Sequence, residues 1–367
     1  MNAFPVTRHQ TRRIQVGAVP VGGGAPVSVQ TMTKTDTRDV AATVAQIREA
    51  AARGCDIVRV AVPDEAAAGA LAAIRKGSPI PVVADIHFRH TLALMALEAG
   101  VDGLRINPGN IGSAERVREV VRAARERKVP IRIGVNGGSL EKEILARFGG
   151  PTPEALVESA LGHVRLLEEV DYREIKISVK ASDVERTVAA YRLLAGRCDY
   201  PLHLGVTEAG TFLAGTVRSS VALGILLAEG IGDTIRVSLT DTPVQEVRVG
   251  LELLRSLGLR PPGPSVTSCP TCGRTRIDVA GIAQRVEEEL EAFCRAHPGP
   301  IPRVAVMGCV VNGPGEAREA DIAVAGGDGQ GVIYVRGEPG ARVPEAEIVE
   351  ALMAEVKRWK ARERLYE

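Results

Sequence analysis

Three of the cysteines are spaced to hold one metal centre. Cys269 and Cys272 are separated by two residues, so a single tight turn can aim both thiols at the same atom. Cys309 lies further along, in a loop rich in Gly and Pro that ends at Glu316. Three thiolates fill three corners of a tetrahedron, and Glu316 is the closest oxygen ligand in the sequence for the fourth. This set favours an iron-sulfur cluster with one iron open to a weaker ligand or to substrate.

Other interpretations of these cysteines give different chemistry. A structural zinc site would normally close with a fourth Cys or a nearby His, and a lone CxxC pair is also typical of a redox dithiol. The third cysteine in a glycine-rich turn favours a metal, and the open fourth position favours iron and sulfide over zinc. The remaining three cysteines lie in or beside apolar segments, where a free thiol usually packs as a small hydrophobe; they are Cys55, Cys198 and Cys294.

Most of the chain alternates short β-branched runs with helical patterns. The runs fall at residues 27–31, 57–60, 81–85, 103–106, 131–135, 175–179, 202–206 and 234–237. Continuous apolar strands joined by helices predict a parallel sheet covered on its faces. Eight strand-helix units predict a (β/α)8 TIM barrel, an α/β fold, rather than an open doubly wound sheet. A short hairpin over residues 12–26 is expected to plug one end of the barrel.

Polar side chains gather where these strands end, which is where a barrel of this kind places its chemistry. The expected substrate-binding residues are Arg59, Arg105, Asn107, Arg132, Asn136, Lys180, Arg236 and Ser238. Five of these are cations, and a buried set of cations requires an anion, so the pattern predicts a di- or polyphosphate ligand. In the alternative interpretation, Arg132 pairs inside the barrel with an acid, Asp85, Glu208 or Asp241.

Two prolines, a glycine and a third proline at 261–264 interrupt the alternation and mark a linker. The expected domains are therefore a substrate-binding TIM barrel at residues 1–264 and a cluster domain at residues 265–367. In the second domain, strands at 266–268 and 303–307 lead to the cysteines. Helices at 278–297 and 345–364 and a hairpin at 322–325 and 332–336 complete a small α+β module.

Composition excludes several classes of protein. The 367 residues include 46 basic and 45 acidic side chains and only 3% aromatics, so nucleic acid is not an expected partner. The six cysteines have no disulfide-framework spacing, and no uncharged segment reaches the length of a membrane span. We therefore expect a cytoplasmic protein with no membrane partner.

Seven short motifs spread over the chain resemble those of a known protein family. They are residues 29–33, 84–88, 104–112, 133–140, 207–210, 269–275 and 309–316. In these motifs the sequence resembles the family of bacterial 4-hydroxy-3-methylbut-2-enyl diphosphate synthases of the non-mevalonate isoprenoid pathway, in its two-domain form. Thr31 and Lys34 depart from the Ser and Asn expected at those positions.

The resemblance implies a [4Fe-4S] cluster held by Cys269, Cys272, Cys309 and Glu316. It also implies an oxidoreductase that uses two electrons to open and deoxygenate 2-C-methyl-D-erythritol 2,4-cyclodiphosphate. Flavodoxin or ferredoxin would donate the electrons, and the protein would form a head-to-tail homodimer. We expect Glu316 to be the ligand that leaves the iron so that a substrate oxygen can bind there. The candidates for delivering a proton to the departing hydroxyl are Glu208, His87 and Asp85.

Three other activities would make different demands on the sequence. A non-redox iron-sulfur hydratase or dehydratase acting on a phosphorylated small molecule would need no reductant. An iron-sulfur sensor or electron relay would have no use for cations at a barrel mouth. A radical S-adenosylmethionine enzyme would carry its three cysteines as CxxxCxxC, a spacing that this sequence lacks.

Overall fold

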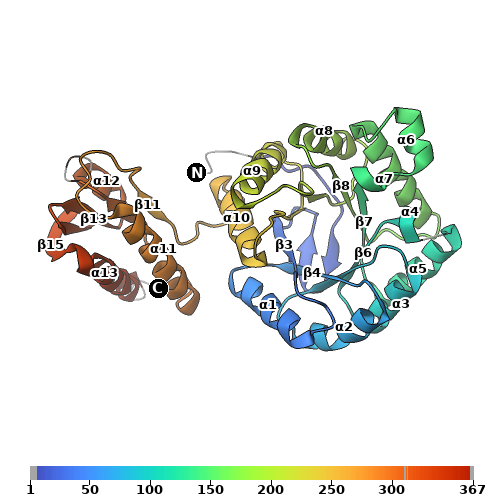
Figure 1. The fold of residues 1–367 in the computed structure, drawn as a ribbon, viewed down its shortest axis with the longest axis horizontal. Coiled ribbons are helices and arrows are strands. Elements are labelled where there is room, and N and C mark those ends of the chain that lie inside the picture. The colour runs from blue at the N-terminus through green and yellow to red at the C-terminus, as the bar shows by residue number, and fades with distance from the viewer. Residues whose placement is uncertain (1–5, 112, 310, 312, 364–367) are drawn as a thin grey trace. The chain divides into compact units, whose positions relative to one another are not determined.

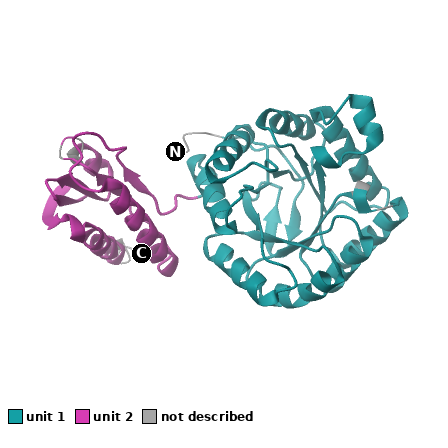
Figure 2. Ribbon diagram, viewed as in Figure 1, with its two compact units in different colours: residues 1–260 teal, residues 261–367 magenta. Residues whose placement is uncertain are grey.

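The computed structural model describes residues 6–111, 113–309, 311 and 313–363. The chain forms two compact units, Met1–Arg260 and Pro261–Glu367 (Figure 2). The division falls at the start of the Pro- and Gly-rich segment 261–264. Each unit has a separate hydrophobic core.

The first unit contains a barrel of parallel strands (Figure 1). The sheet order is β8-β7-β6-β5-β4-β3-β10-β9, and a parallel bridge between Ile177 and Leu202 joins its two ends. The strands are β3 (Ser28–Met32), β4 (Ile57–Ala61), β5 (Val82–Asp85), β6 (Gly103–Ile106), β7 (Ile131–Asn136), β8 (Ile175–Lys180), β9 (His203–Leu204) and β10 (Thr234–Ile235). The predicted eight-stranded barrel is confirmed, although β9 and β10 are shorter than the patterns at 202–206 and 234–237 predicted.

Helices follow the strands and surround the barrel (Figure 1). The main ones are α1 (Val40–Ala52), α2 (Glu65–Gly77), α3 (His90–Glu98), α5 (Ala114–Arg127), α7 (Pro153–Glu168), α8 (Val184–Ala195), α9 (Phe212–Ala228) and α10 (Pro243–Ser256). Short helices α4 (Pro108–Ile111), η1 (Gly137–Ser139) and α6 (Lys142–Phe148) lie in the loops after β6 and β7. Side-chain caps fix several helix starts by accepting a backbone N–H; they are Asp39, Asp64, Thr152, Asp183 and Thr242.

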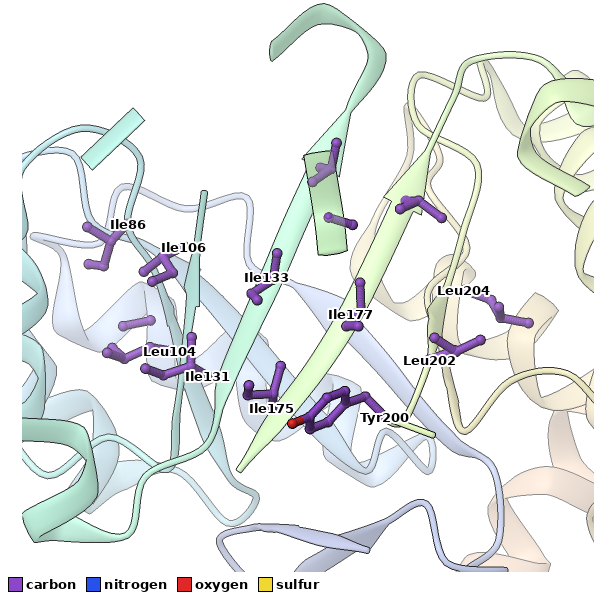
Figure 3. Packing of buried hydrophobic residues seen from close by; sticks show 14 of the residues in the cluster. Ile86, Leu104, Ile106, Ile131, Ile133, Ile175, Ile177, Tyr200, Leu202 and Leu204 are labelled. Atoms are coloured by element: carbon purple, nitrogen blue, oxygen red, sulfur yellow. The ribbon is translucent and has the colours of Figure 1, made fainter. Parts of the chain in front are cut away.

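Apolar side chains on the outer face of the barrel pack against these helices. Ile133, Ile177 and Leu204 are fully buried members of this core (Figure 3). Successive residues of a strand point to opposite faces of the sheet. The strand residues that alternate with these outer apolar residues therefore point into the barrel. Several of those inward residues are charged, including Arg105, Arg132 and Lys176. The same strands therefore build an apolar outer core and a polar interior.

A hairpin closes the barrel at the end where its strands begin. β1 (Ile14–Val16) pairs antiparallel with β2 (Val19–Val21). Its side chains form a buried apolar cluster with Ile57 and Val83 of the barrel strands. This confirms the predicted plug and leaves the carboxyl ends of the strands as the open face.

The second unit is a five-stranded mixed sheet with helices. The order is β11 (Val266–Ser268), β12 (Val304–Met307), β13 (Ile322–Gly327), β14 (Gln330–Val335) and β15 (Glu338–Pro344). The first three strands run parallel, and β13, β14 and β15 are antiparallel. α11 (Val279–Ala296) and α13 (Ile348–Glu363) pack together over a core that includes Val286, Ile322 and Leu352.

Sequence reasoning missed two elements of this unit, β15 and α12 (Gly313–Glu319). The start of the predicted helix at 345–364 is a separate short helix, η2 (Glu345–Glu347). Arg364 in that prediction, Gly112 in the fourth-strand motif, and Val310 and Asn312 in the cysteine loop lie outside the described residues.

We expect the stability of the barrel unit to depend on the outer core. Replacing Ile177 with Ala should lower the free energy of unfolding by about 2–5 kcal/mol, because a fully buried side chain would leave a cavity. Denaturant unfolding followed by circular dichroism measures this change. Glu98→Ala on the exposed face of α3 is the control and should stay within about 0.5 kcal/mol of the parent. Equal losses in the two variants would contradict the assignment of the core.

Candidate functional site

A polar pocket opens at the carboxyl ends of the barrel strands. It is lined by Arg59, Asp85, His87, Arg105, Arg132, Asn136, Ser178, Lys180, Thr207, Arg236 and Ser238. Five of these side chains are cations, and one is a carboxylate. The structure thus brings together in one pocket nine of the residues singled out by sequence, contributed by strands far apart in the chain.

Asp85 organises one side of the pocket. Its carboxylate lies 3.1 Å from Arg105 Nη1, 3.6 Å from Arg59 Nε and 3.4 Å from His87 Nε2. Burial alone would raise the pKa of Asp85, but the charge of Arg59, the hydrogen bond with His87 and the charge of Arg105 hold it well below its usual range. Asp85 is therefore ionised, and it fixes two guanidinium groups and an imidazole at the pocket wall.

Glu246 organises the opposite side and was missed by sequence reasoning. It is a buried residue of α10, and its two oxygens accept hydrogen bonds from Arg236 at 3.2 and 3.3 Å. It also accepts bonds from Thr31 Oγ1 at 2.7 Å and from the backbone N–H of Leu239 at 3.1 Å, and it lies 3.3 Å from Lys34 Nζ. The signal was present in the sequence, because Glu246 shares the buried helix face of Val247 and Gly250.

Thr31 and Lys34, which depart from the expected residues, both contact this carboxylate. Lys34 Nζ also donates to the backbone carbonyls of Leu239, at 2.7 Å, and Asp241. Thr31 and Lys34 therefore help to position Glu246, which binds Arg236, and Lys34 also holds the loop after β10.

Two cations of the pocket have no such carboxylate within the described part of the chain. Arg132 Nε and Nη1 are buried without a hydrogen-bond partner, so the alternative pairing of Arg132 with an acid is not found. Burial, together with Arg59 and Arg105, lowers the pKa of Arg132, and burial together with Arg132 and Arg59 lowers the pKa of Lys180. A guanidinium keeps its proton in proteins, so Arg132 is a buried charge that a bound anion would stabilise.

Two inward-facing glycines make room for the long cationic side chains. A Cβ at Gly134 would lie 2.5 Å from Arg105 Nε, and a Cβ at Gly205 would lie 2.5 Å from Lys180 Nζ. At Gly205 the added atom would also lie 2.8 Å from the backbone oxygen of Arg236, which cannot swing away. The positions of the cations therefore depend on residues with no side chain.

Two of the site residues expected in the barrel unit do not line the pocket. Asn107 Nδ2 donates to Ser139 Oγ at 3.1 Å, which ties the loop after β6 to the loop after β7. Glu208 is exposed in the loop after β9, with φ of 52°, beside the pocket residue Thr207. Both residues lie next to the mouth without being part of its wall.

The cysteines of the second unit follow neighbouring parallel strands. Cys269 comes directly after β11, and Cys309 comes two residues after β12. The backbone N–H of Gly308 donates to Cys269 Sγ at 3.3 Å, so the two segments are in contact. Cys272 is exposed, and Glu316 is exposed in the first turn of α12. Across the described part of the chain, no three His, Cys, Asp or Glu side chains surround a single metal position.

None of the helices within the described ranges combines the length and the apolar composition that a membrane crossing requires.

Both units match models of one protein family. Residues 11–251 match the GcpE TIM-barrel domain, and residues 265–358 match the GcpE protein C-terminal domain. The chain belongs to the GcpE family. The first match lies within the barrel unit and the second within the cysteine-bearing unit, so the GcpE pattern accounts for both parts of the fold.

Relatives within the GcpE family are similar over nearly their whole length. A Geobacter sulfurreducens protein is 64% identical over 95% of this chain and 98% of its own length. A Maridesulfovibrio salexigens protein is 61% identical over 91% of this chain and 92% of its own length, and one from Thermodesulfovibrio yellowstonii is 55% identical over 96% and 100%. All three are named 4-hydroxy-3-methylbut-2-en-1-yl diphosphate synthase (flavodoxin).

We predict that Gly205→Ala weakens anion binding without unfolding the barrel. The added methyl group must displace Lys180 and press on the backbone of Arg236, so the dissociation constant for inorganic pyrophosphate should rise about tenfold or more. Isothermal titration calorimetry measures it. The matched control is Gly69→Ala on α2, where a Cβ would meet no atom within 4 Å. Unchanged affinity in Gly205→Ala would show that Lys180 does not contact the anion.

Proposed function

We propose that this chain opens and deoxygenates 2-C-methyl-D-erythritol 2,4-cyclodiphosphate with two electrons, giving 4-hydroxy-3-methylbut-2-enyl diphosphate. The observation that carries the proposal is the cationic barrel pocket, in a chain of the GcpE family whose relatives bear that synthase name. The reaction belongs to the supply of isoprenoid precursors, and we place it in the cytoplasm.

The pocket supports a diphosphate as the substrate class. Arg59, Arg105, Arg132, Lys180 and Arg236 supply positive charge from separate strands. Guanidinium groups can bind phosphate oxygens in pairs, and a diphosphate carries enough negative charge to balance cations that Asp85 and Glu246 leave uncompensated. Asn136, Ser238 and the nearby Asn107 add neutral donors, which can orient the rest of the substrate.

The cysteine set fits an iron-sulfur cofactor. The thiols of Cys269, Cys272 and Cys309 lie on adjoining loops, and the contact between Gly308 and Cys269 holds two of the loops together. We assign these thiols and Glu316 as ligands of a [4Fe-4S] cluster, with Glu316 as the ligand that can leave. When bound, the cluster would supply electrons and a Lewis-acidic iron.

The pocket suggests different roles for the acid-base candidates. His87 is half exposed at the mouth, and its Nε2 lies 3.4 Å from Asp85 and 3.0 Å from Arg105 Nη1. We assign His87 as the group that delivers a proton to the departing hydroxyl and Asp85 as the ionised group that orients it. Glu208 remains a second candidate donor, because the loop that carries it adjoins the pocket at Thr207.

The electron donor is proposed from the name that the relatives share. That name specifies flavodoxin, and ferredoxin is the alternative donor of the same kind. A non-redox hydratase or dehydratase would use the same phosphate pocket without a reductant, so dependence on reductant separates the two functions.

The outer surface of α9 supports a homodimer. Leu213, Val217, Val221 and Ile225 recur at intervals of four residues on one side of the helix and are 75%, 53%, 46% and 37% exposed. A contiguous apolar stripe of this kind usually marks a protein interface. In the head-to-tail dimer that we propose, the cluster unit of one subunit would cap the barrel of the other.

The function is tested by turnover of the cyclic diphosphate under oxygen-free conditions. Product should form only with reduced flavodoxin or another low-potential donor. Glu316→Ala should lower turnover about a hundredfold while leaving substrate affinity within threefold, because Glu316 is not part of the cationic pocket. Glu319→Ala, also exposed on α12, is the matched control. Turnover without a reductant would support the hydratase, and full activity of Glu316→Ala would remove its assigned role.

The dimer is tested with Val217→Glu. A buried carboxylate at the centre of the stripe would be costly, so the dimer dissociation constant from sedimentation velocity should rise at least about a hundredfold. Ala66→Glu, at an exposed position of α2, should have a much smaller effect. A dimer that persists unchanged in Val217→Glu would place the interface elsewhere.

A further inference from the structure

One buried lysine of the barrel interior lies beneath the pocket and outside its wall. Lys176 is the second residue of β8, and its side chain points into the barrel. It lies two positions before Ser178 and four before Lys180, which do line the pocket. The residue is 2% exposed, and its Nζ has no hydrogen-bond partner. An ammonium group in this position is unusual, since a buried charge is normally paired.

The groups around Lys176 are cations or neutral. Arg132 on β7 stands directly beside it in the strand register. Arg59 on β4 adds further positive charge, and His203 lies on the other neighbouring strand, β9. Burial, followed by Arg132, Lys180 and Lys176 itself, lowers the pKa of His203, so that imidazole is neutral at pH 7.

The buried carboxylates of the barrel are already engaged elsewhere. Asp85 is bound by Arg59, Arg105 and His87, and Glu246 by Arg236, Thr31 and Lys34. Asp233 accepts from Arg8, Thr11 and the backbone of Leu202. Among the described residues, Lys176 therefore has positive neighbours and no acidic partner.

We propose that Lys176 takes up a proton when a diphosphate enters the pocket, so that an additional positive charge forms beneath the anion only in the complex. This inference rests on the diphosphate substrate proposed above. The anion would cancel the repulsion from Arg132 and Arg59 and would attract an ammonium group. Lys176 then acts as an electrostatic positioning residue below the substrate, without touching the bond that breaks.

The direction of the effect follows from the two states of the lysine. In the structure, burial and then the charges of Arg132 and Arg59 lower the pKa of Lys176 to about 7. Above pH 7 the empty protein therefore holds this side chain mostly as a neutral amine. A bound anion raises the pKa toward its ordinary value, so binding consumes a proton between the two values, and affinity falls as pH rises through that window.

The same arrangement discriminates between ligands. A neutral sugar would leave the repulsion among the cations unchanged and would gain nothing from the proton. A dianion would gain the attraction of one more charge, in an interior where water does not screen it well. The specificity for a diphosphate would thus come partly from a residue that does not contact it.

Proton uptake can be measured directly. The cyclic diphosphate is titrated into oxidised, cluster-loaded protein at pH 8, by calorimetry in buffers that differ in ionisation enthalpy. The parent protein should take up about one proton more than a protein with no titrating side chain at position 176, because burial lowers the pKa of Lys180 as well and Lys180 stays in every variant. Lys176→Met should lose this uptake and should bind about tenfold more weakly at pH 7. Lys176→Arg, which stays charged, should also lose the uptake but should keep its affinity as pH rises.

The variants separate Lys176 from other titrating groups. Lys180, whose pKa burial also lowers, remains present in both variants, so uptake that is unchanged in both would assign the proton to another group and would overturn the proposal. No uptake by the parent protein would overturn it as well, even if a variant failed to fold. Thermal unfolding and iron content check folding, and Lys176→Met should unfold at the parent temperature or above it.

A failure of the proposed substrate can be recognised separately. If the cyclic diphosphate does not bind, the substrate assignment is wrong, and the same titration with inorganic pyrophosphate tests Lys176. Uptake with pyrophosphate that disappears in both variants would then support the role of Lys176 alone. If neither anion binds, the pocket is not an anion site and the proposal for Lys176 fails with it.

Discussion

Positive charge inside the barrel is the constraint on which the rest of the structure depends. Transferring a guanidinium or an ammonium group out of water costs several kcal/mol unless an opposite charge accompanies it. Asp85 and Glu246 each bind cations of the pocket, but no carboxylate of a described residue pairs with Arg132 or Lys180. The fold tolerates this surplus because the outer face of the same strands buries a large apolar core. The apolar core thus offsets the cost of burying these cations, and a bound anion would lower that cost.

The architecture concentrates that charge at one end. The hairpin formed by β1 and β2 covers the opposite end with apolar side chains. These side chains cannot solvate the charged groups of the interior from that end. Gly134 and Gly205 remove side chains at the levels where Arg105 and Lys180 must cross the barrel. The parallel strands then deliver their last inward residues to one mouth, which is why residues distant in sequence share a pocket.

The sequence predicted the barrel and most of the pocket wall because both follow from a short-range pattern. Apolar runs give the strands, and strand ends give Arg59, Lys180 and Arg236. Glu246 escaped because it comes from a helix, where attention to strand ends cannot find it. Lys176 escaped because it lies near the start of β8 rather than at its end, and its significance depends on neighbours on the adjacent strands β7 and β9. β15 and α12 escaped because one is a largely exposed strand and the other begins with Gly, Pro and Gly.

The second unit applies the same geometry to a different chemical group. β11 and β12 are adjacent parallel strands, and their carboxyl ends carry Cys269 and the loop of Cys309 just as the barrel strands carry cations. Thiolates would repel one another and a phosphate alike, so a site that gathered both groups on one set of strands would oppose its own assembly. Separate cores let each unit bear its own electrostatic cost. A reaction that needs both an anion pocket and an electron source is therefore most readily built from two units that fold around different charges.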